Sequence, residues 1–203
     1  MVKRILCLWT VLLALCCTPS SWALLIPKMT TEELMASANT VVLGKCLFFH
    51  YHPDADGKTL YTIIEFKVNE YLKNDLGKDE IFLAQIAREE DANGARKLGD
   101  VSFQLDEEAI LFLTEEDNQG FRHVLGLPQG KFAIRQNRKG ERTITRDLTG
   151  VQFFKRQTGE LSKAKRSHEE KSLDIFRREL RFIASQLSAK KQNMVLLNPN
   201  KSL

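Results

Sequence analysis

Cysteine is scarce in this sequence, and most of it lies at one end of the chain. Of the four cysteines among 203 residues, Cys7, Cys16 and Cys17 lie in the first 17 positions, so Cys46 is the one cysteine beyond residue 23. One cysteine cannot form an intrachain disulfide, so the domain after residue 23 must be held together by burial of apolar side chains. Cys46 lies in an apolar segment, and we interpret it as a small core residue and not as a nucleophile.

The apolar segment near the N-terminus is too short to span a bilayer. Ile5–Cys17 has thirteen residues, whereas a membrane-spanning helix needs about 20. Lys3 and Arg4 precede it and Ser21-Trp22-Ala23 follows it, which is the order of a secretory signal peptide. We predict cleavage after residue 23, a mature chain that is not transmembrane, and a secreted or periplasmic location. An uncleaved anchor and a lipid-modified cysteine are the alternatives.

Basic residues are few in the first part of the mature chain, and acidic residues are few in the last. Residues 24–127 hold 10 Lys and Arg against 19 Asp and Glu, and residues 128–203 hold 18 against 7. Solvated surfaces of opposite charge explain this most simply. The basic C-terminal part is also suited to a protein, or to an anionic envelope polymer or lipid. Nucleic acid is not expected as a partner, because this part has few aromatic residues for stacking on bases.

The mature chain begins with a short helix and continues as many short strands. Thr30 and Glu33 form a capping box before a helix that ends near Ala38. The longest strand pattern, Thr59–Lys73, alternates cleanly, and at about 3.3 Å per residue it must bend to fit a small domain. The other strands are predicted at Val41–His52, Glu80–Ala87, Ala109–Thr114, Phe121–Leu127 and Lys131–Gln136, with weaker patterns at Val101–Gln104, Arg142–Arg146 and Val151–Phe154. Such a series favours a β-barrel or sandwich over residues 24–159.

Residues 160–203 are predicted to form a basic linker, a C-terminal helix and a tail. Ser167–Glu170 is a second capping box. The apolar residues after it share one side at helical spacing: Leu173, Phe176, Leu180, Ile183, Ala184 and Leu187. We expect this side to dock on its own domain, with a partner's groove as the alternative.

Motifs of catalysis are absent from the sequence. It has no Gly-x-Ser-x-Gly elbow and no glycine-rich phosphate loop. Glu107 and Glu108, like the other acidic pairs, have no apolar surroundings in the predicted arrangement, so they are not expected to act as general acids. Asp54–Gly57 lacks the later ligands of a calcium loop and is interpreted as a hairpin turn. We therefore predict no catalytic residue and no cofactor.

His50 and His52 are the candidate metal ligands. On a strand their side chains point to the same face, with Cα atoms about 7 Å apart. Two imidazoles at this spacing can share one metal ion, with His123 as a possible third ligand from elsewhere. Two partly exposed histidines without a metal are the simpler interpretation.

Several segments in order resemble a family of bacterial secreted proteins that is similar to tissue inhibitors of metalloproteinases and netrin-like modules. The resembling segments are Thr31–Ala38, Val41–Lys45, Tyr61–Lys73, Ala109–Leu113 and Gly126–Phe132, about half of the chain. The resemblance implies an OB-like five-stranded barrel, closed or partly open, with a short N-terminal helix and a C-terminal amphipathic helix. In the animal inhibitors an N-terminal cysteine binds the protease zinc, whereas the predicted mature chain here begins with Leu24.

Together these observations predict an exported, non-enzymatic binding module of the cell envelope or extracellular space. Its contacts are expected through the loop Arg88–Asp100 or through the basic C-terminal part. The alternatives are a metal-dependent protein that uses His50 and His52, and a protein that resembles protease inhibitors.

Overall fold

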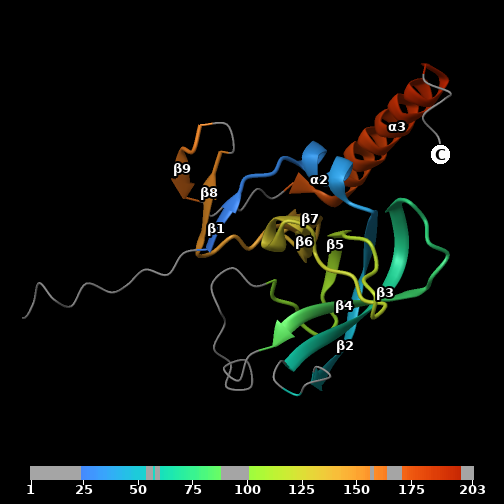
Figure 1. The fold of residues 1–203 in the computed structure, drawn as a ribbon. Helices are drawn as coiled ribbons and strands as arrows, with labels where there is room; N and C mark the ends of the chain where they lie inside the picture. The colour runs from blue at the N-terminus through green and yellow to red at the C-terminus, as the bar shows by residue number, and fades with distance from the viewer. Residues whose placement is uncertain are drawn as a thin grey trace, which may run out of the picture.

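The protein is mainly β, as predicted, and is built on two sheets (Figure 1). A computed structural model describes residues 24–53, 57, 60–87, 101–155, 158–163 and 171–197. The larger sheet has the strand order β10-β7-β6-β5-β2-β3-β4, and the smaller has the order β1-β8-β9. Within these residues neither sheet closes on itself, so the closed barrel that we considered is not found.

Most strands lie where the sequence pattern predicts them. The strands are β1 (Leu24–Pro27), β2 (Thr40–Pro53), β3 (Leu60–Lys73), β4 (Glu80–Ala87), β5 (Glu108–Leu113), β6 (Lys131–Gln136), β7 (Arg142–Thr145), β8 (Val151–Phe154), β9 (Leu161–Lys163) and β10 (Lys171–Ser172). The helices are α2 (Thr31–Ser37), the 3-10 helix η2 (Leu127–Gly130) and α3 (Leu173–Leu197). None of the described helices is long and apolar enough to cross a membrane.

Helix α2 begins at the predicted capping box. The hydroxyl of Thr30 accepts from the amide of Glu33 at 3.2 Å, and the Glu33 carboxylate accepts from the amide of Thr30 at 2.7 Å. At the other end, Lys73 Nζ donates to the carbonyls of Met35 and Ala38 at 2.6 and 2.5 Å. These bonds satisfy backbone groups that helix ends leave unpaired, and they join α2 to the end of β3.

Strands β2 and β3 form a long antiparallel ribbon that bends. Their pairing shifts register at three places, and such bulges increase the local bend and twist. Gly44 lies next to one shift, where an added Cβ would be 2.1 Å from the carbonyl oxygen of Lys67. Another shift lies between Cys46 and Phe48. It reverses the side of the sheet to which the later residues of β2 point.

The predicted strand Phe121–Leu127 is wrong, because this segment makes only two isolated bridges. Arg122 pairs in parallel with Leu83 of β4, and Val124 pairs antiparallel with Leu113 of β5. Gly126 and Leu127 then have positive φ angles of 70° and 57°, and η2 follows. The weaker pattern at Val101–Gln104 is likewise not a strand.

The central strand β5 is buried on both sides, which explains its unbroken apolar sequence. Ile110 and Phe112 join one core cluster, whereas Ala109, Leu111 and Leu113 join another. Helix α3 covers the first cluster. The apolar residues of α3 that pack into this cluster are those of the predicted apolar side: Leu173, Phe176, Leu180, Ile183, Ala184 and Leu187. The helix therefore packs against its own sheet, as predicted.

Candidate functional site

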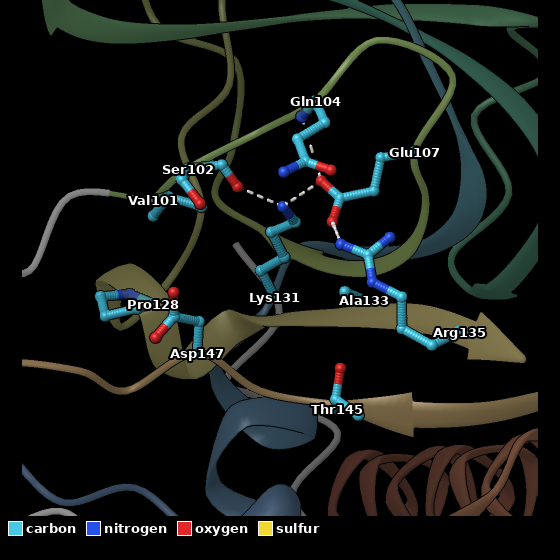
Figure 2. Close-up of a pocket in the computed structure, with 10 residues that line it drawn as sticks. All are labelled: Val101, Ser102, Gln104, Glu107, Pro128, Lys131, Ala133, Arg135, Thr145 and Asp147. Atoms are coloured by element: carbon cyan, nitrogen blue, oxygen red, sulfur yellow. Dashed lines mark hydrogen bonds and ion pairs between the residues drawn. The ribbon is translucent and has the colours of Figure 1, made fainter. Parts of the chain in front are cut away.

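A polar pocket lies between strands β6 and β7 and the segment that precedes β5 (Figure 2). Its volume is about 140 Å³. Lys131, Ala133 and Arg135 alternate along β6 and so point to the same side, and Thr145 of β7 is paired with Ala133. The remaining lining residues are Val101, Ser102, Gln104, Glu107, Pro128 and Asp147.

Glu107 lies at the centre of the ionic contacts of this pocket. Its side chain is 4% exposed, and Lys131 Nζ and Arg135 Nη2 contact its two carboxylate oxygens at 2.5 and 2.6 Å. The backbone amide of Gln104 donates to the same carboxylate at 3.2 Å. Glu107 is thus buried, and the partners of its carboxylate are two cationic side chains and a backbone amide.

The electrostatics of the pocket favour a structural role for this cluster. Burial lowers the pKa of Lys131, against the opposing effect of Glu107. Burial raises the pKa of the nearby Cys46 thiol to about 11, so the thiol stays protonated at neutral pH. Each oxygen of the Glu107 carboxylate accepts from a cationic side chain. These contacts fix the segment 101–107 to β6.

The predicted metal ligands lie on the surface. His50 is 57% exposed at its side chain, and its Nε2 lies 3.4 Å from a carboxylate oxygen of Glu65. The ring nitrogens of His123 contact other groups, the carbonyl of Ala84 at 2.8 Å and the carboxylate of Asp117 at 3.1 Å. In the described part of the chain, no three His, Cys, Asp or Glu side chains are grouped to hold a metal ion. The metal site therefore stays a prediction.

Because of the bulge after Cys46, His50 and Cys46 lie on opposite faces of β2, and not on the same face as the regular strand predicts. Cys46 is fully buried in the second core cluster. His50 instead lies next to Phe48, with ring centroids 6.4 Å apart. Any metal site on β2 would thus not include the thiol.

The outward-facing side of β2, β3 and β4, which we call the outer face, carries a group of exposed apolar side chains. Cross-strand pairing aligns three rows: Phe48, Glu65 and Phe82; His50, Ile63 and Ala84; His52, Tyr61 and Ile86. Phe48, Phe82 and Ile86 are 58%, 41% and 56% exposed. The alternate residues Ile64 and Leu83 face the core, and in the middle row of the outer face Ile63 and Ala84 are 6% and 7% exposed.

Sequence reasoning missed both the buried ionic cluster and the outer face. The cluster has one signal, since Lys131 and Arg135 alternate on β6 with the apolar Phe132 and Ile134. The outer face depends on the register of three strands and on a bulge, which no local pattern gives. Other predicted elements lie outside the described residues: the turn at 54–56, the loop 88–100, the capping box 167–170 and much of the basic stretch between 155 and 171.

Comparison of the chain with protein-family models, with curated proteins and with solved structures found no match in any of the three. Function must therefore be argued from the surfaces and cavities themselves. Four cavities lined by described residues have volumes of about 70 to 270 Å³. Pockets for drug-sized ligands are commonly about 300 Å³ or more, so these cavities favour side chains or small groups over an organic cofactor.

Proposed function

We propose that this protein is an exported, non-enzymatic binding module whose contact surface is the outer face of β2, β3 and β4. The observation that carries the proposal is the exposure of Phe48 on β2 and of Phe82 and Ile86 on β4, the strands on either side of β3 in one sheet. Single exposed apolar residues are ordinary, but a group on one rigid face is typical of an interaction site. Aromatic residues are enriched in the centres of protein–protein interfaces.

The partner that fits this face best is another protein. Apolar rings alternate there with groups that form hydrogen bonds, His50 and Glu65, which is the mixture found in protein interfaces. The face lies on paired strands, so little conformational entropy is lost when it binds. An exported location remains a proposal that rests on the N-terminal sequence pattern.

We also propose that the fold is OB-like. Segment 121–124 is hydrogen-bonded to β4 on one side and to β5 on the other. This segment is not a strand, but its two bridges link β4 to β5, which pairs with β2, and these elements together form a partly open ring. Five-stranded, partly open barrels of this type commonly serve binding. This supports the resemblance to netrin-like modules without assigning an inhibitory residue.

The binding proposal is tested by changing the outer face and, as a control, another exposed apolar pair. The double variant Phe48→Ala with Phe82→Ala is compared with Ile175→Ala and Phe182→Ala on α3, whose side chains are 51% and 65% exposed. Chemical cross-linking in intact producing cells, followed by mass spectrometry, measures the partner captured by each variant. We expect the outer-face variant to lose its cross-linked partner and the α3 variant to keep it.

Equal cross-linking by the two double variants would refute this choice of surface. The circular dichroism spectra and unfolding temperatures of both variants must match those of the wild type, because a general loss of folding would remove any partner. Exposed apolar residues are suitable targets since their removal leaves no cavity.

The second candidate is a metal-dependent function, which the contact between His50 and Glu65 favours. His50 and His52 of β2 would then provide two imidazoles to the metal ion. Metal analysis of the purified protein tests this directly, and His50→Ala with His52→Ala is the control. A stoichiometric metal that the double variant lacks would support this function, and wild-type protein without metal would end it.

A further inference from the structure

We propose that the free edge of β4 at Ile86 binds an extended peptide segment of the partner, which adds as a strand parallel to β4. This inference rests on the proposed binding function and names the form of the partner. β4 is the last strand of the seven-stranded sheet. Edge strands with unpaired backbone groups are templates for such strand addition.

A segment of the chain itself, at Arg122, already pairs with part of this edge. The amide of Ala84 donates to the carbonyl of Arg122, and the amide of Arg122 donates to the carbonyl of Phe82, both at 3.0 Å. The backbone groups of Phe82 and Ala84 therefore point away from β3. Since direction alternates along a strand, those of Ile86 point to the same side.

The chain leaves the edge before it reaches Ile86. His123 and Val124 turn toward β5, where the amide of Thr114 donates to the carbonyl of His123 and Val124 pairs with Leu113. A ring nitrogen of His123 contacts the carbonyl of Ala84 at 2.8 Å. Among the described residues, no strand or bridge pairs with Ile86 on this side.

A cavity of about 260 Å³ lies where the strand would have continued. Its lining includes Ala84, Gln85 and Ile86 of β4, and also His123. The rest of the lining is apolar: Ile64, Leu83, Val101, Phe103, Val124 and Leu127. An apolar cavity of about 150 Å³ is enough for a benzene ring, so one large side chain fits here.

These features together select an extended peptide over a flat protein surface. Alternate side chains of an added strand point to opposite faces. One set would enter the cavity, and the other would continue the outer face beside Phe82 and Ile86. The added strand is thus continuous both with the ladder that Arg122 begins and with the surface proposed for partner binding.

The experiment selects peptides from a random phage-displayed library on the purified mature protein. Selected peptides are synthesised, and their affinities for the wild type, Ile86→Pro and Ile86→Ala are measured by fluorescence anisotropy. Proline removes both the outward amide and the isoleucine side chain, at an edge position that tolerates it, whereas alanine keeps the amide and removes the exposed side chain. We expect alternating apolar residues in the peptides and at least a tenfold loss of affinity for Ile86→Pro. The loss for Ile86→Ala should be clearly smaller.

A second measurement does not depend on the folding of the proline variant. Methylation of single backbone nitrogens in a selected peptide removes one donor at a time, and we expect one alternate set of positions to abolish binding to the wild-type protein. Selection of no peptide, equal affinity for Ile86→Pro, or insensitivity to methylation would overturn the inference. Self-association of the wild type that Ile86→Pro abolishes, measured by sedimentation, would identify a second copy as the occupant and also overturn it.

The two proposals fail separately. If the variant with Phe48→Ala and Phe82→Ala loses its cross-linked partner while Ile86→Pro keeps it, the outer face binds a partner without strand addition. If selected peptides require the amide of Ile86 but no cross-linked partner depends on Phe48 and Phe82, the edge is a peptide site and the outer face is not the interface.

Discussion

At the scale of single residues, the most demanding environment is that of Glu107 and Lys131. Both side chains are less than a tenth exposed and contact each other at 2.5 Å. The ion pair is costly to form, because both charges leave water, but it is more costly to break, because one charge is then left buried without its partner. The cluster therefore specifies where segment 101–107 lies.

This reasoning predicts a large difference between two adjacent glutamates. Glu107→Ala should lower the free energy of unfolding by about 3–5 kcal/mol, because Lys131 remains buried without a carboxylate. Glu108→Ala breaks an exposed pair with Arg142 and should cost less than about 1 kcal/mol. Urea denaturation measures both variants. Similar losses would show that the buried pair is not the stabilising element we take it to be.

A pH dependence follows from Asp117. Its pKa is lowered from the ordinary value of 3.8, first because the amide of Phe121 donates to the carboxylate, and then because of Gln119 and His123. Since the folded pKa is depressed, the contribution to stability is full above pH 3.8 and is lost as the pH falls through the lowered value.

The variant Asp117→Asn tests this expectation. Its amide oxygen can still accept from the turn amides, but it does not titrate. We expect the unfolding temperature of the wild type to fall more steeply than that of Asp117→Asn as the pH is lowered from about 5 to 2. Parallel curves for the two proteins would mean that this carboxylate does not contribute.

At the scale of elements, helix α3 shows how one apolar stripe is used. Leu180 is fully buried against the sheet, whereas Phe182, two residues later, is 65% exposed. Arg177 and Arg181 contact Glu70 of β3, the latter at 2.5 Å. Packing and ion pairs thus hold the first half of the helix on its own domain, and the helical spacing of the sequence alone predicted the packing.

Removal of buried and exposed side chains on this helix should therefore differ strongly. Leu180→Ala should destabilise the protein by about 2–5 kcal/mol, because it leaves a cavity in the core. Phe182→Ala should change stability by less than about 0.5 kcal/mol, as expected for a surface substitution. Thermal unfolding compares the two. A small effect of Leu180→Ala would indicate that α3 does not dock in solution.

At the scale of the whole molecule, Leu24, the predicted first residue of the mature chain, lies in a strand of the folded domain. Leu24 opens β1, and its amide donates to the carbonyl of Gly150 at 3.0 Å. β1 pairs in parallel with β8. A chain cut after residue 23 would keep this bond, because the new amino group lies at the same nitrogen.

The corresponding prediction concerns processing. Protein recovered from the periplasm or medium should begin with Leu24, as shown by intact mass and N-terminal sequencing. Ala23→Arg should accumulate as an uncleaved precursor, because the cleavage site requires small residues. A mature product that retains residues 1–23, or that remains inside the cell, would refute export by this route.

The sequence by itself determined the local elements. Alternation predicted most strands, the capping box predicted α2, and helical spacing predicted the side of α3 that is buried. It was wrong for Phe121–Leu127 because Gly126 and Leu127 take positive φ angles, and the two bridges of this segment depend on distant strands. Local periodicity indicates which side of an element is apolar, but it does not predict which element packs beside it.

Only the tertiary structure decided the candidate sites. The charges of Glu107 and Lys131 are 24 positions apart in the sequence, and they meet because β5 and β6 are paired. The outer face exists because a bulge after Cys46 turns Phe48 and His50 outward. In the described part of the chain no strand pairs with the outward side of Ile86, because the chain turns from β4 to β5 at Val124. Each depends on register and on long-range pairing, which are properties of the assembled sheet and not of any single segment.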